Sequence, residues 1–425
     1  MCQLIMDTYI YSKEPLHTVE EVLAIFNPWW ESTFRAEGIR RQGYLEQLNR
    51  REQTKEIVFI TGLRRVGKTT LVRQYIEGLI ARGQDPKRVL YISMDHPSLV
   101  RESILDILDS YRRLHGLKHN DRFTAVIDEV HLREGFEQEL KTIYDLGHVK
   151  IFATGSSSLF LLERGSFLTG RQRFIEVLPF SFSEYLDLKH IRTKPSDSHL
   201  MVRHAEDYVR AGGLPEYLKT GDPGYLTTLI DSILYKDIAA RRGARNMQVL
   251  RELLLIVTQS CGSKLSPRRI GRILGSSHET VREHLSSFEE ANLIHTVRLK
   301  GKVSESMAAP RKVYLSDTGI VYVLSPTVNV GCLVENCVFN VLRGRGNDPA
   351  YGLVRGKEVD FILPDSCYEV KYTDRVNSED VAHLKDVKVK RRIVITKNQT
   401  GRLDGVELVP LWRFMLEDKE RHIAR

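Results

Sequence analysis

The sequence predicts an α/β fold built on a parallel β-sheet that helices cover on both faces. An apolar, β-branched run at 57–61 leads through a glycine-rich loop into an amphipathic helix. Further apolar runs at 88–93, 123–127, 149–153 and 173–177 alternate with helical patterns, as strands of a parallel sheet do. The chain has 425 residues, more than one hydrophobic core usually supports, so we expect further domains after the sheet.

The loop after the first strand has the spacing of a phosphate-binding loop, G-x-x-x-x-G-K-T. The residues expected to bind a nucleotide are Gly62, Leu63, Arg64, Arg65, Val66, Gly67, Lys68, Thr69 and Thr70. Backbone N–H groups of such a loop and of the following helix converge on an anion. Lys68 is expected to reach the β- and γ-phosphates, and the Thr69 hydroxyl to bind Mg²⁺. ATP and Mg²⁺ are therefore the predicted cofactors; a chance glycine-rich turn is the less favoured alternative.

Composition narrows the class of protein. Hydrophobic residues make up 42% and charged residues 28%, as in ordinary soluble proteins. The net charge of +8 is compatible with a nucleic-acid partner but does not establish one. No apolar run is long enough to span a membrane and no signal peptide is visible, so we expect a cytoplasmic protein without a membrane partner. The five cysteines contain no C-x-x-C pair and are expected to be reduced thiols.

Acidic residues at the end of the third predicted strand complete the nucleotide site. Asp128 and Glu129 directly follow the buried run 123–127. The carboxyl end of a strand beside the phosphate loop is where Mg²⁺ is held, so Asp128 is assigned to the metal. Glu129 is assigned as the base that orients and polarises the attacking water.

Two further side chains of this part of the chain have alternative interpretations. Ser156, with Thr154 as second choice, follows the fourth strand and is expected to contact the γ-phosphate or the water; an N-cap for the next helix is equally favoured. Arg171 is a candidate arginine finger, although an ordinary surface ion pair is slightly favoured.

We expect five segments along the chain. Residues 1–50 form an N-terminal strap that includes Trp29 and Trp30, and 51–180 form the ATPase core. Residues 181–245 are helical and are expected to form a lid over the nucleotide. Residues 246–325 have the pattern of a winged helix, and 326–425 that of a small α/β domain.

The distribution of charges on the predicted winged helix is unusual for a DNA-binding domain. Its third helix should enter the major groove, yet its glutamates outnumber its single arginine, Arg282. Basic residues lie instead on the second helix and on the wing, where Arg298, Arg311 and Lys312 also occur. The residues assigned to nucleic-acid binding are Arg268, Arg269, Arg272, Lys300 and Lys302. A purely architectural winged helix is about as well supported.

The last segment carries a second set of charged residues. Glu335 lies in a predicted helix at 331–343, Asp360 in a predicted strand at 357–363, and Glu369 and Lys371 in a third strand as Glu-x-Lys. Glu369 and Lys371 share a face because strand side chains alternate. Carboxylates that hold Mg²⁺ and a lysine that stabilises developing charge suit phosphodiester hydrolysis. The alternative is the charged outer face of a small sheet. We expect these charges to be unnecessary for folding.

Together these motifs resemble a prokaryotic, especially archaeal, family of AAA+-class ATPases that carries a C-terminal domain of unknown function. The most specific pieces are Gly62–Thr70, Asp128-Glu129, Thr154-Gly155-Ser156, Gly170-Arg171 and Gly212-Gly213-Leu214-Pro215. The C-terminal segment resembles the PD-(D/E)XK nuclease fold at Glu335, Asp360, Glu369 and Lys371, although Val359 stands where that pattern often has proline.

The resemblance implies an ATPase whose turnover drives or licenses a transaction on nucleic acid, DNA rather than RNA, with metal-dependent cleavage at the C-terminal site. The alternative is a nucleotide-dependent switch or scaffold whose nuclease-like domain binds without cutting. A homo-oligomer is left open.

Overall fold

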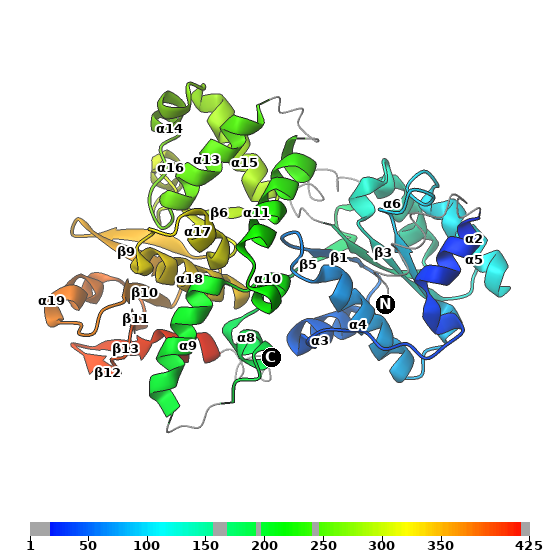
Figure 1. Ribbon diagram of the computed structural model, residues 1–425, viewed down its shortest axis with the longest axis horizontal. Coiled ribbons are helices and arrows are strands. Elements are labelled where there is room, and N and C mark those ends of the chain that lie inside the picture. The colour runs from blue at the N-terminus through cyan, green and yellow to red at the C-terminus, as the bar shows by residue number, and fades with distance from the viewer. Residues whose placement is uncertain (1–17, 156–167, 193–196, 240–245, 418–425) are drawn as a thin grey trace. The chain divides into compact units, whose positions relative to one another are not determined.

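The computed structural model describes residues 18–155, 168–192, 197–239 and 246–417. The chain divides into two compact units (Figure 1). The first contains the chain up to Thr61 and Gly67–Val177, and the second contains Gly62–Val66 and the chain from Leu178 onward.

The first unit is built on a five-stranded parallel sheet. Its strands, in spatial order, are β2 (Val89–Ser93), β3 (Phe123–Asp128), β4 (Val149–Thr154), β1 (Ile57–Thr61) and β5 (Gln172–Glu176). The long buried runs without alternation of polar residues are typical of strands covered on both faces. All five strands lie within one residue of their predicted positions, so the predicted α/β sheet is confirmed.

Helices cover both faces of this sheet. The helices are α2 (Val19–Phe26), α3 (Gln42–Arg51), α4 (Lys68–Ala81), α5 (Ile104–His115) and α6 (Phe136–Leu146), with short turns η1 (Pro28–Trp30), η2 (Pro86–Arg88) and η3 (Val130–Leu132). Residues of α2, α5 and α6 pack on one face in a single hydrophobic core. Helix α4 packs on the other face, where the Tyr75 ring lies 4.7 Å from that of Phe152.

The segment before the phosphate loop binds the edge strand β2. The Asn27 amide accepts from Tyr91 N–H at 2.6 Å and donates to Tyr91 C=O at 2.8 Å. Trp29 and Trp30 both donate from Nε1 to the Val89 carbonyl at 3.0 Å. The backbone groups of Tyr91 and Val89, which an edge strand would leave without a partner, thus form hydrogen bonds within the unit.

The second unit begins with helices. They are α8 (Phe182–Leu188), α9 (Ser198–Ala211), α10 (Pro215–Thr220), α11 (Pro223–Ser232) and η6 (Ile233–Ala239), followed by α13 (Met247–Gln259), α14 (Pro267–Leu274) and α15 (His278–Glu290). An antiparallel pair follows, β6 (Ile294–Val297) and β7 (Lys312–Leu315), with α16 (Val303–Ala308) between them and α17 (Thr318–Leu324) after them. These elements lie where a winged helix was expected; that designation stays a prediction.

The chain ends in a six-stranded mixed sheet. Helix α18 (Val330–Gly344) precedes it, and its spatial order is β12 (Gly401–Leu403), β13 (Val406–Pro410), β11 (Arg391–Thr396), β10 (Ser366–Lys371), β9 (Lys357–Ile362) and β8 (Ala350–Val354). Short helices α19 (Ser378–Val381), η7 (Ala382–Asp386) and α20 (Leu411–Leu416) lie in its connections and at its end. Strands β8, β9 and β10 pair antiparallel, and β10, β11 and β13 pair parallel.

The backbone of the wing is hydrogen-bonded to this sheet. Tyr351 accepts from Lys300 N–H at 2.8 Å and donates from its own N–H to the Arg298 carbonyl at 3.0 Å. The buried Asn336 side chain accepts from Leu315 N–H at 2.8 Å and donates to the Leu315 carbonyl at 2.7 Å. The expected segments 246–325 and 326–425 therefore share one compact unit.

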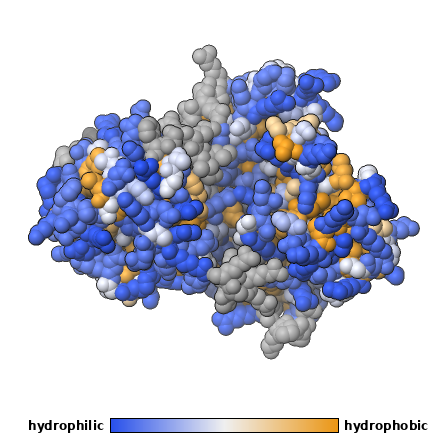
Figure 2. Space-filling view, turned by 180° about the vertical axis from the view of Figure 1, so that it is seen from behind, coloured by the Kyte–Doolittle hydropathy of each residue, from blue (hydrophilic) through white to orange (hydrophobic). Residues whose placement is uncertain are grey.

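The face drawn in Figure 2 is largely hydrophilic, with hydrophobic residues in separate patches. Within the described residues, no helix has the length and apolar character needed to cross a membrane.

Candidate functional site

Backbone conformation explains the glycines of the phosphate loop. The loop leaves β1 at Gly62 with φ 136°, passes Arg65 with φ 65° and enters α4 at Gly67 with φ 95°. A Cβ atom added to Gly67 would contact nothing within 4 Å, so the left-handed conformation, and not lack of space, favours glycine there. Lys68 begins α4 and is buried.

Asp128 is the centre of a hydroxyl cluster at the carboxyl end of β3. Its Oδ2 accepts from Thr69 Oγ1 at 2.8 Å and from the Tyr91 hydroxyl at 2.7 Å, and its Oδ1 accepts from Thr154 Oγ1. Burial, and then the charge of Asp128, raise the pKa of Tyr91, so the phenol stays protonated and donates. The structure thus brings together Thr69 and Asp128, the two predicted magnesium ligands of the nucleotide site.

Glu129 is held in an uncommon conformation next to Asp128. Its φ is 52°, in the left-handed region, and its N–H donates to Thr154 Oγ1 at 3.0 Å. Its Oε2 lies 3.4 Å from His131 Nδ1. Thr154, the second choice after Ser156, therefore binds both acidic residues. Ser156 itself lies outside the described residues.

Arg171 is not brought to this cluster within its own chain. Its carbonyl accepts from Ile57 N–H at 2.8 Å, at the amino ends of β1 and β5, whereas the phosphate loop follows the carboxyl end of β1. Its Nε lies 3.4 Å from Asp145 Oδ1. This is the surface ion pair that was the favoured alternative to an arginine finger.

The two loop arginines have partners within the second unit. Arg64 binds Asp237 of η6 through two hydrogen bonds of 3.0 and 2.7 Å. The Arg65 guanidinium lies 5.3 Å from the centre of the Tyr225 ring. No sequence motif indicates these partners.

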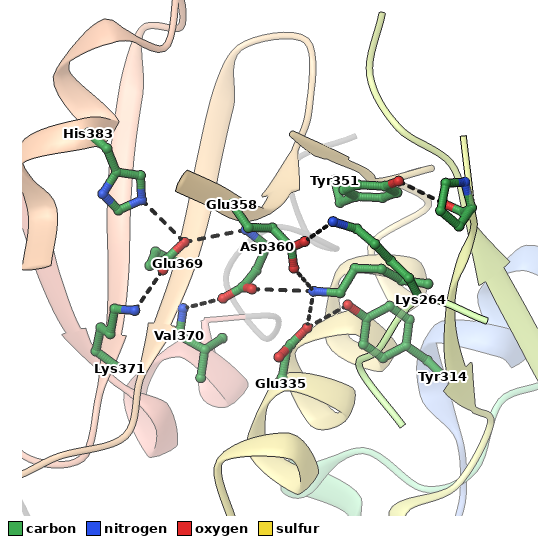
Figure 3. A network of polar contacts seen from close by, with 12 residues as sticks. Lys264, Tyr314, Glu335, Tyr351, Glu358, Asp360, Glu369, Val370, Lys371 and His383 are labelled. Atoms are coloured by element: carbon green, nitrogen blue, oxygen red, sulfur yellow. Dashed lines mark hydrogen bonds and ion pairs between the residues drawn. The ribbon is translucent and has the colours of Figure 1, made fainter. Parts of the chain in front are cut away.

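A second polar network joins α18, β7 and β9 (Figure 3). Lys312 Nζ, from β7, lies 2.7 Å from Glu335 Oε1, 2.8 Å from Glu358 Oε1 and 3.4 Å from Asp360 Oδ1. The Tyr314 hydroxyl donates to Glu335 Oε1 at 2.7 Å, and Lys264 Nζ lies 2.6 Å from Glu358 Oε2.

The remaining predicted residues adjoin this network on β10. Glu369 Oε1 lies 2.9 Å from Lys371 Nζ, and Glu369 Oε2 accepts from Asp360 N–H at 3.4 Å. Asp360 Oδ2 accepts from Val370 N–H at 2.8 Å. Burial, and then the charges of Glu335 and Glu369, raise the pKa of the Asp360 carboxyl above its ordinary range.

Two expectations about this network need correction. Lys312 was placed among the surface charges of the wing, but its side chain is only 2% exposed. The side chains of Asp360 and Glu369 are 13% and 5% exposed, so they belong to a largely buried network and not to the charged outer face of a sheet. That folding does not need them stays a prediction. Lys264, Tyr314 and Glu358 were missed because no local pattern marks them.

The four predicted nuclease residues do not form a metal centre in this arrangement. Among the described residues, no group of three or more His, Cys, Asp or Glu side chains is arranged to hold a metal ion. An ammonium group, and not an open position, lies between Glu335 and Asp360.

The residues assigned to nucleic-acid binding are at the surface. Arg268, Arg269 and Arg272 of α14 are exposed, and no ion pair to them is found in the described part of the chain. Lys302 is exposed, and Lys300 donates from Nζ to the Leu363 carbonyl at 3.3 Å.

Solved structures with a weak likeness to the chain include two complexes with DNA. The Drosophila ORC bound to AT-rich DNA and Cdc6 has a TM-score of 0.25 and 12% identity, covering 75% of this chain and 96% of that one. The replication initiator DnaA bound to AMPPCP and single-stranded DNA has a TM-score of 0.28 and 18% identity, covering 65% and 92%. Neither TM-score indicates a shared overall architecture.

Relatives match nearly the whole chain. An uncharacterized protein of Haemophilus influenzae is 26% identical over 402 residues, covering 89% of this chain and 99% of its own length. An uncharacterized protein of Methanocaldococcus jannaschii is 27% identical over 399 residues, covering 85% and 88%.

Two family models match separate parts of the chain. Residues 202–329 match a domain of unknown function, DUF8612, which spans the expected boundary between lid and winged helix. Residues 54–186 match a model described as an AAA domain. That match includes the phosphate loop, Asp128 and Glu129, and it supports an ATP-binding P-loop ATPase domain in the first part of the chain.

Proposed function

We propose that the chain is a Mg²⁺-dependent ATPase whose turnover is centred on the phosphate loop, Asp128 and Glu129. The observation that carries this proposal is the 2.8 Å contact between Thr69 Oγ1 and Asp128 Oδ2. Hydroxyl and carboxylate oxygens are the donors that Mg²⁺ prefers, and these two are already side by side.

Each residue of this site has a defined task. The N–H groups of the loop and Lys68 bind the phosphates. Glu129 accepts the proton of the attacking water, and Thr154 fixes the Glu129 backbone through its hydroxyl. When bound, Mg²⁺ neutralises charge on the β- and γ-phosphate oxygens.

Two substitutions separate binding from turnover. Lys68→Ala should abolish tight nucleotide binding, because it removes the cation at the phosphates. Glu129→Gln should keep binding and lower phosphate release about 100-fold or more, because an amide accepts no proton. Fluorescent-nucleotide titration and phosphate release measure the two effects, with the exposed Glu134→Gln as control. Normal turnover by Glu129→Gln would show that another group is the base.

We propose further that the chain binds nucleic acid, preferentially DNA, through α14. The exposed Arg268, Arg269 and Arg272 form a basic helix face in a chain of net charge +8. Contacts of this kind go to phosphates and carry little sequence preference.

Replacing these three arginines together by alanine should lower affinity and flatten its dependence on salt, because fewer counterions are released. Fluorescence anisotropy with single- and double-stranded oligonucleotides over a salt series measures both. The triple alanine variant of the exposed Lys385, Lys388 and Lys390 matches the change in charge. If the affinity of both variants depends equally on salt concentration, α14 does not bind the phosphates, and a purely architectural winged helix is favoured.

Metal-dependent phosphodiester cleavage is the second candidate activity. Glu335, Asp360, Glu369 and Lys371 adjoin one another in one polar network, as that candidate requires. The lysine between the carboxylates argues against it, so we favour the alternative in which the C-terminal domain binds without cutting.

A further inference from the structure

We infer that Lys312 is the resident cation of the C-terminal carboxylate cluster. Its ammonium group lies between Glu335 and Asp360, two of the three carboxylates that the nuclease resemblance assigns to a divalent metal ion. It thereby makes the cluster an ionic brace between β7 and the C-terminal sheet. This inference goes beyond the proposed ATPase and does not depend on it.

The hydrogen-bond inventory of the cluster supports this inference. A lysine ammonium has three N–H donors, and three carboxylates surround this one. The nearest oxygens belong to Glu335, Glu358 and Asp360, at 2.7, 2.8 and 3.4 Å. Figure 3 shows these three side chains turned toward one another. The oxygens that a metal ion would need are therefore already used by a donor.

Other donors bind the second oxygens of Glu358 and Asp360, and a further donor shares the Glu335 oxygen with Lys312. Tyr314 donates to the same Glu335 oxygen at 2.7 Å, and Lys264 binds the second Glu358 oxygen at 2.6 Å. The second Asp360 oxygen accepts from Val370 N–H at 2.8 Å. Mg²⁺ demands near-ideal octahedral geometry at about 2.0–2.1 Å, which oxygens fixed in this way do not offer.

Lys312 cannot readily move out of the cluster. Its backbone is paired with Val297 in the β6–β7 ladder and forms a bridge with Lys264 on its other side. Three residues further on, Leu315 is bound through both backbone groups by Asn336 of α18. The backbone from which Lys312 extends is therefore fixed next to α18.

Buried charges that lose their partner are strongly unfavourable, so Lys312 and the carboxylates depend on one another. Without the Lys312 ammonium, three carboxylates would be left close together around the space that the ammonium had filled. A divalent cation would then offset two of the three negative charges.

The test is Mn²⁺ binding to the full chain without nucleotide, followed by electron paramagnetic resonance. All variants carry Asp128→Asn, which removes the metal ligand of the ATPase site. We expect no stoichiometric Mn²⁺ in this parent at micromolar concentrations. Adding Lys312→Met should create stoichiometric binding and make the melting temperature rise with Mn²⁺. Adding Lys390→Met, an exposed lysine, should behave as the parent does.

Two results would overturn the inference. One is stoichiometric Mn²⁺ in the parent that Asp360→Asn abolishes, because the metal would then coexist with Lys312. The other is a folded Lys312→Met variant with unchanged stability and no Mn²⁺ binding. If Lys312→Met does not fold, the parent titration alone decides: absence of Mn²⁺ supports the inference and Asp360-dependent binding overturns it.

Discussion

Two buried charged residues at opposite ends of β7 are stabilised in different ways. Lys312 is surrounded by carboxylates, whereas the Asp317 carboxylate binds backbone N–H groups. Asp317 accepts from Gly213 at 2.6 Å, Gly319 at 2.9 Å and Ile320 at 3.3 Å. Burial raises the pKa of Asp317 to about 6, in spite of these hydrogen bonds. The unit therefore holds an acid whose charged form is less stable in the folded than in the unfolded chain.

The sign of the resulting pH dependence follows from the raised pKa. Between the ordinary value of 3.8 and about 6, the folded chain binds a proton that the unfolded chain does not. The contribution of Asp317 to stability is therefore fully present below 3.8 and is lost as the pH rises through about 6.

We expect the difference in unfolding free energy between the parent and Asp317→Asn to change by about 2–3 kcal/mol between pH 4 and 7. The parent should be relatively more stable on the acid side. Urea unfolding of both proteins at several pH values measures this. A difference that is constant over this range would mean that the pKa of Asp317 is not raised.

At the scale of elements, the segment Gly212–Leu214 shows why a glycine pair stands between α9 and α10. A Cβ atom on Gly213 would lie 2.2 Å from the Phe180 carbonyl oxygen, and one on Gly212 would lie 2.1 Å from Asp317 Oδ1. Gly213 also accepts from Phe180 N–H at 2.7 Å. The pair is thus a point of close backbone contact that joins the segment before α8 to the start of α17.

Gly213→Ala should destabilise the second unit by about 1–3 kcal/mol or more, because the clash is with backbone atoms that cannot rotate away. Gly43→Ala is the matched control, since a Cβ atom there meets nothing within 4 Å and alanine favours the helix. Thermal unfolding of both variants makes the comparison. Equal melting temperatures for the two would mean that the loop before α8 adapts to the extra methyl group.

At the scale of the whole molecule, local patterns predict the elements well and their partners poorly. The strands of the first unit are recognisable because each is a short, β-branched, fully buried run. The phosphate loop and Asp128 are recognisable because their chemistry requires particular residues at particular spacings.

Contacts between distant residues leave no comparable pattern. Lys312 meets Glu335 across 23 residues and Asp360 across 48, and nothing in the sequence around Lys312 distinguishes it from an exposed wing lysine. For the same reason, the sequence suggests a boundary at 325/326, although Asn336 and Lys312 bind the two sides together. The structure brings Glu335, Asp360, Glu369 and Lys371 into one network, but no local pattern indicates the Lys312 ammonium between Glu335 and Asp360.

The contacts that Asn336 makes across residue 325 lead to a prediction about cooperative unfolding within the second unit. The Asn336 side chain is fully buried and accepts from Cys261 Sγ as well as from Leu315 N–H. In Asn336→Ala, the Leu315 N–H loses the Asn336 acceptor and the Leu315 carbonyl keeps only the Asn340 amide donor at 3.2 Å. An unsatisfied buried N–H costs about 1–3 kcal/mol. Because α13, β7 and α18 share this residue, we expect their amides to become less protected together.

Hydrogen exchange followed by mass spectrometry measures this effect. Peptides from 247–259 and from 330–344 should both exchange about 10-fold faster or more in Asn336→Ala, since 1.4 kcal/mol corresponds to a factor of ten. Peptides from β1, β3 and β4 of the first unit should be unchanged. Asn347→Ala, which removes a single hydrogen bond to the Leu342 carbonyl, is the control. Faster exchange on only one side of residue 325 would mean that the two segments open independently and that Asn336 does not couple them.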